Sequence, residues 1–308
     1  MTPGAPQVSV LVATRNRHES LARCVESVVS QSHPSWELVV LDDASKEPVQ
    51  PALAGRVQGA RVRWLRSETP SGVAGARNTL IAAAAADLLV FLDDDAWFED
   101  GAALERVAAH FAHDRQLGIL AFRITLRGEE EGELQAPFSR RVRQRDPGLE
   151  QSVVDASYFV GAGHAIRREV FERCGEYQAG FVYGLEELDL SYAAVREGFH
   201  IRYAGDVRVS HAPGRPVLGG TGVRSDELYH QVRNRIRVAY RNLPARYVAP
   251  HIAAWLAIYG VQAVKRRAPS AYLRGLADGL RGLRGAERRP LDARAVGYLR
   301  RNYGRLWY

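Results

Sequence analysis

Residues 88–97 read LLVFLDDDAW, and this stretch decides the fold. Five apolar residues run directly into three consecutive aspartates, Asp93, Asp94 and Asp95. A short apolar run predicts a buried strand, so the aspartates lie at its carboxyl end. Adjacent carboxylates repel one another, and burying them is costly unless a positive charge lies between them. The stretch therefore indicates a divalent-cation site held by Asp93 and Asp95; the alternative is a capping cluster for the next helix.

The chain around this stretch alternates apolar strands with helical segments. Strands are expected at 8–13, 38–41, 62–65 and 88–92, and helices at 18–31, 73–86 and 101–112. Apolar runs without in–out alternation predict a parallel sheet that is covered by helices on both faces. The predicted fold class is therefore α/β, with a Rossmann-like nucleotide-binding sheet flanked by helices.

Polar side chains follow the predicted strands at one edge of this sheet. The first strand is followed by Thr14, Arg15 and Arg17, and the second strand ends in Asp42 and Asp43. Ligands of open α/β sheets bind at the carboxyl ends of the strands. Two acidic strand tips on one edge are hard to explain as helix capping, so they favour the cation-site interpretation of residues 93–95.

The pattern changes after Leu117. A strand is expected at 119–126, helices at 167–175 and 185–198, and two short strands at 199–211. Residues 127–150 are polar and predict a long mobile loop. Residues 212–226 form a glycine-rich loop, and neither loop carries a readable code for a ligand.

Composition places the chain among globular proteins with a substantial core. It has 308 residues, of which 46% are hydrophobic and 25% are charged. Its two cysteines, Cys24 and Cys174, have no metal-like or redox-like spacing, which favours a reducing cytoplasm. No basic region followed by an apolar core marks a signal peptide at the N-terminus.

The basic residues are concentrated near the C-terminus. The chain carries a net charge of +7, but residues 226–308 contain 17 Lys/Arg against 5 Asp/Glu, a net charge of +12, so the first 225 residues carry −5. Apolar residues recur at helical spacing in this segment, which predicts basic amphipathic helices. Such helices suit an anionic membrane surface or a second subunit in a homodimer; no nucleic-acid recognition module is apparent. Residues 248–264 are too short and too interrupted for a membrane span.

Several motifs in this order resemble the inverting family 2 glycosyltransferases with the GT-A fold. They are VSVLVATRNR, VVLDDAS, SGVAGARNTLIAAAAADLLVFLDDDA and GLEELDLSYAAVREGFHIRYAGDVRVSH. The resemblance covers residues 7–240 and implies a nucleotide-sugar donor, a divalent metal and single-displacement transfer with inversion. It divides the chain into a catalytic domain at 1–225, with a donor half at 1–116 and an acceptor half at 117–225, and a helical extension at 226–308.

The resemblance also implies roles for the sheet-edge residues. Asp42 and Asp43 match the position that contacts the nucleotide base. Asp93 matches a residue that faces the ribose and also reaches the metal, and Asp95 matches the metal ligand, with Mg²⁺ or Mn²⁺ as the ion. The element with Gly72, Ala76, Arg77 and Asn78 lies against the nucleotide in this family, as do the polar residues Thr14, Arg15 and Arg17 at the first strand. Asp94 belongs to this group without an assigned role.

The chemistry requires a general base, because an acceptor hydroxyl is a weak nucleophile at neutral pH. The family places this base in an acidic pair that opens a helix, which matches Glu186 and Glu187. Glu187 stands where aspartate is usual; it is the first choice for the base and Glu186 the second. Asp189 is interpreted as structural or acceptor-binding. The alternative for all three is that acidic residues in a first helical turn favour the helix dipole.

Some members of the family use a histidine at the position of His211 as a further metal ligand. Imidazole suits Mn²⁺ better than Mg²⁺. The alternative is a strand-end histidine bonded to the backbone. Arg215 and Arg224, in the loop that follows, are candidates for neutralising the leaving diphosphate, unless they are simply solvated.

Two further residues near the predicted site have a structural and a functional interpretation. His164 lies near the acceptor in the family, but a buried structural histidine is the favoured interpretation. Trp97 follows the aspartates and could stack on a sugar, although packing in the core is the commoner fate of tryptophan.

Two other function classes remain open at this point. A nucleotidyltransferase shares the sheet and the acidic metal site, but it usually has a glycine-rich loop after the first strand, which ATRNRHES lacks. A non-catalytic sugar-nucleotide binding protein would not need the full set of acids. The leading hypothesis is transfer from a UDP-, GDP- or dTDP-sugar to a glycan or lipid-linked acceptor in cell-surface polysaccharide synthesis. The expected location is the cytoplasm or the inner face of the cell membrane.

Overall fold

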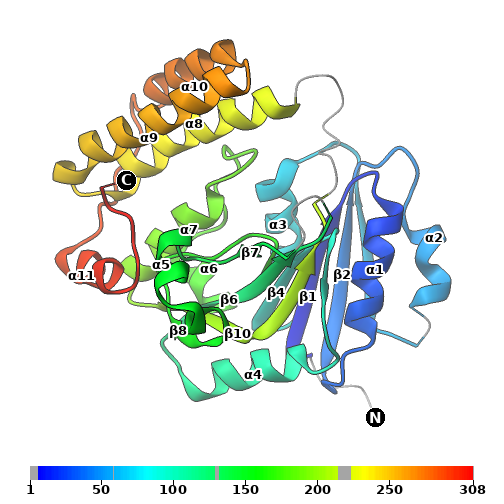
Figure 1. Ribbon diagram of the computed structural model, residues 1–308. Helices are drawn as coiled ribbons and strands as arrows, with labels where there is room; N and C mark the ends of the chain where they lie inside the picture. Colours follow the sequence, from blue (N-terminus) through cyan, green and yellow to red (C-terminus); the bar gives the residue numbers. More distant parts are fainter. Residues whose placement is uncertain (1–5, 58, 129–131, 214–222, 308) are drawn as a thin grey trace.

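The computed structural model describes residues 6–57, 59–128, 132–213 and 223–307, with the side chains of 223–226 left out. Its centre is a single mixed sheet flanked by helices, with a layer of long helices at one end (Figure 1). The strands are β1 (Val8–Thr14), β2 (Trp36–Asp43), β3 (Val62–Ser67), β4 (Leu88–Asp93), β5 (Ala96–Phe98), β6 (Leu117–Leu126), β7 (Leu134–Gln135), β8 (Val153–Asp155), β9 (Gly163–Arg167) and β10 (His200–His211).

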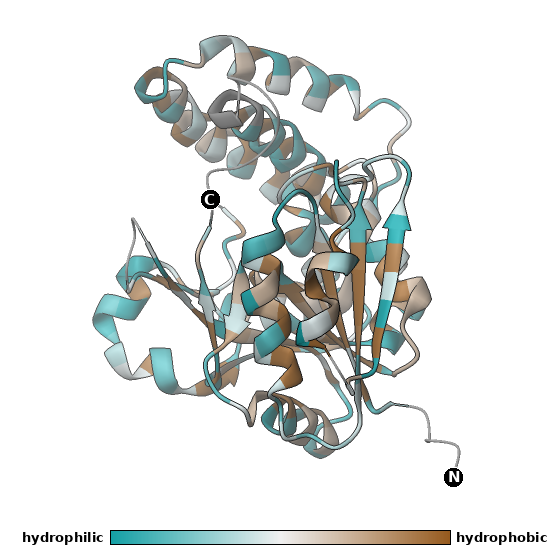
Figure 2. Cartoon of the chain, turned by 90° about the vertical axis from the view of Figure 1, so that its right-hand side faces the viewer, coloured by the Kyte–Doolittle hydropathy of each residue, from teal (hydrophilic) through white to brown (hydrophobic). Residues whose placement is uncertain are grey.

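The N-terminal half of the sheet is parallel, as the apolar runs predict. Along the sheet the order is β3-β2-β1-β4-β9-β6-β10-β5, with β7 paired to β6 and β8 paired to β10. Strands β3, β2, β1 and β4 run parallel. Nearly all residues of β2, β1 and β4 are buried, whichever face of the sheet their side chains point to, whereas the edge strand β3 is partly exposed. Figure 2 shows the consequence: the strands inside the sheet are hydrophobic along their length and hydrophilic at their ends, whereas the frontmost strand is mixed.

The parallel arrangement predicted for the first half is confirmed, and the sheet becomes mixed beyond β4. Strand β9 runs antiparallel between β4 and β6, and the sequence analysis missed it. Its five residues, GHAIR, have no alternation and sit between two predicted elements, so length and periodicity gave no signal. β9 matters for the site because it places the backbone of 160–163 beside the end of β4, where Asp93 N donates to Ala162 O at 3.2 Å.

Two further predictions about the second half need correction. Residues 199–211 form one long strand, β10, with an irregularity between Ala204 and Arg208, instead of two short strands. The segment 127–150 contains β7 and the helices α5 (Arg140–Arg145) and η2 (Pro147–Gln151), so its described part is not a plain loop. The expected loop at 212–226 ends earlier, because α8 begins at Val223.

Helices cover both faces of the sheet. Their apolar stripes pack into two separate cores, one on each side. On one face lie α1 (His18–Val29) and α4 (Ala103–His113); on the other lie α3 (Gly72–Ala83), α6 (Arg168–Cys174), α7 (Glu186–Arg196) and α11 (Ala293–Arg301). The short helices α2 (Gln50–Leu53) and η1 (Ala54–Arg56) follow β2.

The C-terminal helices α8 (Val223–Asn242), α9 (Ala245–Lys265) and α10 (Pro269–Arg281) form what we call the helical layer. They share a third core of their own, which includes Leu228, Val232 and Tyr259. A Cβ atom at Gly275 would lie 2.7 Å from the carbonyl oxygen of Tyr229, so glycine allows α10 to approach α8 closely. The C-terminal end of α8 packs instead with α7 in one of the two cores of the sheet. This contact joins the helical layer to the sheet (Figure 1).

Helix α9 is the one described helix with the length and composition of a membrane span. It has 21 residues and a mean hydropathy of 1.2 in its most apolar window, of which 22% is buried. Pro250 lies inside the helix, and α9 packs on both α8 and α10 through this layer's core. The predicted helix is therefore confirmed. Its length and composition alone are weak support for a membrane-spanning helix.

Candidate active site

The acidic tips of β2 and β4 lie on either side of β1. The register places Thr14 of β1 beside Asp42 of β2, and Ala13 beside Asp93 of β4. Parallel strands in matching register end at the same edge, so the carboxylates of Asp42, Asp43, Asp93, Asp94 and Asp95 gather there. We call this group the acid edge.

Asp93, Asp95 and His211 form a cluster that could hold a metal ion. One ligand atom from each residue lies within 4.8 Å of the others. The cluster depends on the antiparallel pairing of β5 with β10, which sets Ala96 opposite His211 and brings the imidazole back to the acid edge. His211 Nε2 lies 3.1 Å from Asp95 Oδ1, and its Nδ1 lies 3.2 Å from Gln135 Oε1. Gln135 therefore orients the ring, a contact that the sequence pattern did not indicate.

Positive charge already balances part of this cluster. Arg17 Nη1 lies 3.1 Å from Asp94 Oδ1 and 2.6 Å from Asp95 Oδ2, and Thr14 Oγ1 donates to Asp94 Oδ2 at 2.6 Å. Burial raises the pKa of Asp94 to about 6, although Arg17 and Thr14 oppose the rise. Both carboxylate oxygens of Asp94 are thus held by Thr14 and Arg17, and Asp94 is not a member of the cluster of Asp93, Asp95 and His211.

The negative charge of Asp93 and Asp95 that Arg17 does not balance favours a cation at the cluster. Burial raises the pKa of Asp93, and repulsion from Asp95 adds to this effect against the attraction of Arg77. Burial lowers the pKa of His211, but the two aspartates outweigh it and the net pKa is raised. Two carboxylates and an imidazole are a donor set that suits Mg²⁺ or Mn²⁺, so the residues present fit the predicted metal.

Asp42 and Asp43 shape the loops around the acid edge. Asp42 accepts a hydrogen bond from Ser45 N at 2.9 Å and pairs with Arg66. Asp43 Oδ1 accepts from Ser71 N at 2.9 Å and from Ser71 Oγ at 2.8 Å, which caps the start of α3. Gly72, the first residue of α3, has φ +72°, and a Cβ there would lie 3.3 Å from Val182 O, so glycine is required at this turn.

Arg77 connects the acid edge to the acidic pair on α7. Its buried guanidinium lies 3.5 Å from Asp93 Oδ1, 3.3 Å from Glu186 Oε1 and 3.2 Å from Glu187 Oε1. It also donates to Gly161 O at 3.2 Å and sits over the ring of Tyr177. Burial lowers the pKa of Arg77, but the surrounding acids raise it more, so the group stays charged. The family resemblance implies that Arg77 contacts the nucleotide, whereas in the structure it bridges carboxylates.

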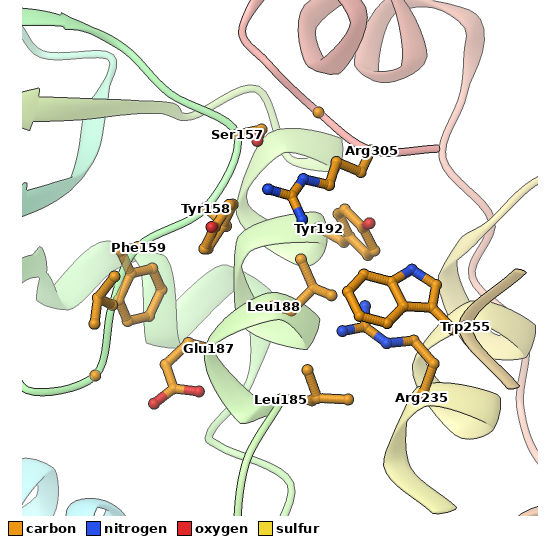
Figure 3. A pocket seen from close by; sticks show the side chains of 13 residues that line it. Ser157, Tyr158, Phe159, Leu185, Glu187, Leu188, Tyr192, Arg235, Trp255 and Arg305 are labelled. Atoms are coloured by element: carbon orange, nitrogen blue, oxygen red, sulfur yellow. The ribbon is translucent and has the colours of Figure 1, made fainter. Parts of the chain in front are cut away.

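Glu186 and Glu187 open α7 with different surroundings. Glu186 is buried, and burial together with Glu187 raises its pKa to about 8, against the attraction of Arg77. Its Oε2 has no hydrogen-bond partner among the described residues. The side chain of Glu187 is 19% exposed, and it faces Arg77 and the cavity shown in Figure 3. Of the two carboxylates, Glu187 is the one that lines this cavity.

Glycine at 161 makes room for this arrangement. A Cβ at Gly161 would lie 2.1 Å from Glu187 Oε1 and 2.9 Å from Arg77 Nη2. No side chain can stand there unless the carboxylate moves. The GAG sequence at 161–163 was interpreted only as a glycine-tipped apolar run, because its role depends on a helix 25 residues away.

Helix α8 holds the segment that leads into α7. Asn234 Nδ2 donates to Tyr183 O at 3.0 Å and to Gly184 O at 2.8 Å, and Arg233 Nη2 donates to Gly180 O at 2.6 Å. Gly184 and Leu185 both have positive φ, at +75° and +72°, so the turn before Glu186 is strained and needs such support. The sequence did not indicate that the basic extension would position the acidic pair.

Three predicted site residues have structural partners. Asp189 accepts from Asn242 Nδ2 at 2.6 Å and so joins α7 to α8, which agrees with its structural interpretation. His164 is fully buried, stacks on Phe91, and lies 3.2 Å from the hydroxyl of Tyr177 through Nε2. Asn78 exchanges two hydrogen bonds with the main chain of Tyr177. Tyr177, which the sequence analysis missed, thus lies between Asn78, His164 and Arg77.

The remaining predicted residues do not join the cluster. Trp97 lies on β5 under the guanidinium of Arg23, 4.6 Å from the ring centroid, on the face opposite His211. The side chain is half-buried, and its role in stacking on a sugar stays a prediction. Arg15 is exposed beside the acid edge. Arg215 lies outside the described residues, and Arg224 is on α8 with its side chain undescribed.

Comparison with known proteins gives several partial sequence matches. Residues 9–175 match the family model described as glycosyl transferase family 2. The putative teichuronic acid biosynthesis glycosyltransferase TuaG of Bacillus subtilis is 35% identical over 102 residues, or 32% of this chain and 40% of that protein. The Escherichia coli β-1,3-glucosyltransferase WfgD, whose acceptor is named as α-D-GlcNAc-diphosphoundecaprenol, is 33% identical over 91 residues, or 29% and 36%. The matches thus span less than half of either relative.

Solved structures share the fold at low sequence identity. Residues 1–349 of TarS from S. aureus align with a TM-score of 0.60 and 16% identity, over 81% of this chain and 70% of that one. The mannosyltransferase PcManGT of Pyrobaculum calidifontis, in complex with GDP-Man and Mn²⁺, aligns with a TM-score of 0.57 and 18% identity, over 97% and 87%. Because the family model covers more than half of the chain, this protein belongs to glycosyl transferase family 2 and has the GT-A fold.

Proposed function

We propose that this protein is a metal-dependent, inverting glycosyltransferase. It would move a sugar from a nucleotide-diphosphate donor to a hydroxyl group of a glycan or lipid-linked acceptor. The observation that carries the proposal is the position of Arg77, which contacts both Asp93 of the acid edge and Glu187 at the opening of α7. A donor at the acid edge and an acceptor beside Glu187 would then meet within the span of one side chain.

The donor would bind along the acid edge. Asp42, Asp43, Gly72 and the turn after β1 surround the position proposed for the nucleotide. Asp93, Asp95 and His211 would hold Mg²⁺ or Mn²⁺, which supplies positive charge to the departing diphosphate. The proposal draws support from PcManGT, whose structure contains GDP-Man and Mn²⁺.

Glu187 would act as the general base. Its carboxylate takes the proton of the acceptor hydroxyl while that oxygen attacks the anomeric carbon from the side opposite the diphosphate. The new carbon–oxygen bond forms as the bond to the diphosphate oxygen breaks, so the configuration inverts. Arg77 holds Glu187 by an ion pair at 3.2 Å and fixes its direction. Glu186, buried and with a raised pKa, would stay protonated beside it.

The cellular setting is also a proposal. The relatives TuaG and WfgD are named for teichuronic acid synthesis and for transfer to a diphosphoundecaprenol-linked sugar, which supports a role in envelope polysaccharide synthesis. The exposed apolar residues Val261, Val264, Leu273 and Leu280 on α9 and α10 suit contact with the inner face of the membrane or with a second subunit. Sedimentation with anionic vesicles, compared with the oligomeric state in solution, separates these two.

A donor screen tests the proposal. UDP-, GDP- and dTDP-sugars are incubated with the protein and Mg²⁺ or Mn²⁺, and the slow release of nucleoside diphosphate is measured. Glu187→Gln should lower acceptor-dependent turnover about 10²- to 10⁴-fold while donor binding is kept. Glu172→Gln, an exposed glutamate on α6, is the matched control and should behave as the wild type. Full activity of Glu187→Gln would remove Glu187 from the role of base.

A further inference from the structure

A cavity lies between α7 and the helical layer, directly beside Glu187. Its volume is about 320 Å³. Glu187, Leu188 and Tyr192 of α7 form one wall, and Arg235 of α8, Trp255 of α9 and Arg305 of the C-terminal segment form the other (Figure 3). None of the five aspartates of the acid edge lines it. The cavity is therefore distinct from the acid edge, and Arg77 connects the two, because it contacts Asp93 as well as Glu187 and Gly161 of the lining.

Arg235 is an unusual group in this cavity. Only 7% of its surface is exposed, and its guanidinium carbon lies 3.9 Å from the centroid of the Trp255 ring. Within the described part of the chain, its Nε has no hydrogen-bond partner and no carboxylate lies within ion-pair distance. A buried guanidinium is costly unless its charge and its donors are satisfied. The fold thus retains at the cavity wall a cation that lacks an anion.

Arg305 adds a second positive charge to the same cavity. It is half-buried and, among the described residues, has no acidic partner within ion-pair distance. Burial raises the pKa of Tyr158, and the charges of Arg305 and Arg235 oppose that rise, so both guanidinium groups act on the same phenol. Figure 3 shows the two arginine side chains entering the cavity from different elements. The one acid in the lining, Glu187, is already paired with Arg77.

We propose that this cavity binds the phosphate or diphosphate group of the acceptor, and that Arg235 and Arg305 are its ligands. Guanidinium groups bind phosphate oxygens through paired N–H donors. Trp255 and Tyr192 offer aromatic faces for the sugar or chain attached to the phosphate. The inference rests on the proposed function, because Glu187 would then face the hydroxyl of the sugar that this phosphate carries.

Binding measurements test this without relying on turnover. The protein is saturated with UDP and Mg²⁺ so that the donor position is filled, and three probe ligands are titrated calorimetrically. These are glucose 1-phosphate, glucose diphosphate linked to a decyl chain, and neutral decyl glucoside. Arg235→Met and Arg305→Gln should each weaken binding of the phosphorylated probes about tenfold or more and leave the neutral probe unchanged.

The probes also separate the sources of the phosphate. Arginine-dependent binding of the decyl diphosphate alone identifies a lipid-linked acceptor, whereas equal binding of glucose 1-phosphate identifies a soluble one; both support the proposal. Equal binding of decyl glucoside would show that the cavity recognises only the chain, and would overturn it. Unchanged binding of both phosphorylated probes by both variants would overturn it as well.

Two controls exclude a merely structural role for these arginines. Arg246 also lies over an aromatic ring, that of Tyr247, but it is exposed and outside the cavity, so Arg246→Gln should bind all probes as the wild type does. Arg235→Met should melt at the wild-type temperature or above it, because it removes a buried unpaired charge. A large loss of stability would instead make Arg235 a packing residue. Donor hydrolysis by the wild type, measured separately, reports on the proposed function itself.

Discussion

The acid edge and the cavity beside the helical layer are built in opposite ways. The acid edge comes from short, contiguous stretches, each of them an apolar strand followed at once by aspartates. The cavity takes its charged residues from α7, α8 and the C-terminal segment, where the arginines are single members of a generally basic sequence. The comparison shows that a site at strand ends can be predicted from a short stretch of sequence. A site between helices can be recognised only when the packing of the helices is known.

The first prediction breaks the acid edge at one residue. Asp95→Asn removes a carboxylate from the cluster with Asp93 and His211, and it should lower transfer about a thousandfold, because a bound cation contributes several kcal/mol to the transition state. Release of nucleoside diphosphate at saturating Mn²⁺ measures the effect. Asp87 directly precedes β4, at the end far from the acid edge, and is exposed, so Asp87→Asn is the control and should keep full activity. Equal losses in both would show that the effect is general instability.

The second prediction concerns the point where the two regions meet. Gly161→Ala places a methyl group where Glu187 Oε1 now lies, so the carboxylate must turn away. Misplacing the proposed base in this way should lower the rate about a hundredfold. Because Glu187 is flexible at its end, folding should be kept, as measured by circular dichroism. Gly260→Ala on α9, where a Cβ meets nothing within 4 Å, is the matched control.

The third prediction separates the helical layer from the sheet domain. Asn242→Ala leaves the buried carboxylate of Asp189 without its hydrogen bond of 2.6 Å, and it should lower the free energy of unfolding by about 2 kcal/mol. Chemical denaturation measures the loss. The double variant with Asp189→Leu should lose less than the sum of the two single changes, because the pair interacts directly. Strict additivity would contradict the assigned contact.

The fourth prediction uses the pH dependence of Glu186. Its pKa is raised from 4.5 to about 8 in the folded protein, so the folded state favours the protonated acid, and this contribution to stability is lost as the pH rises through that range. Glu186→Gln mimics the protonated form at every pH. Its stability relative to the wild type should therefore improve by at least about 1 kcal/mol between pH 5 and pH 9. A difference independent of pH, in thermal unfolding across this range, would mean that Glu186 is ionised throughout.

Much of the acid edge was predictable because its determinants are local. The apolar runs at 8–13, 38–41 and 88–92 and the aspartates after two of them were enough to predict the parallel strands and the acid edge, and β1, β2 and β4 confirm the strands. The prediction that His211 is a metal ligand required the family resemblance. Nothing in the residues around His211 indicates that β5 would pair with β10 and bring it to Asp95.

The sequence by itself determined which chemistry is available: a row of acids at strand ends, an acidic pair at the start of a helix, and a basic C-terminus. The tertiary structure alone decided how these meet. Arg77 of α3 became a bridge because β4 brings Asp93 and α7 brings Glu187 to the same guanidinium, and Arg235 became a cavity residue because Trp255 of α9 packs against it. The physical reason is that side-chain type and strand periodicity are local properties, whereas burial, and therefore the cost of an unpaired charge, is set by elements far apart in the chain.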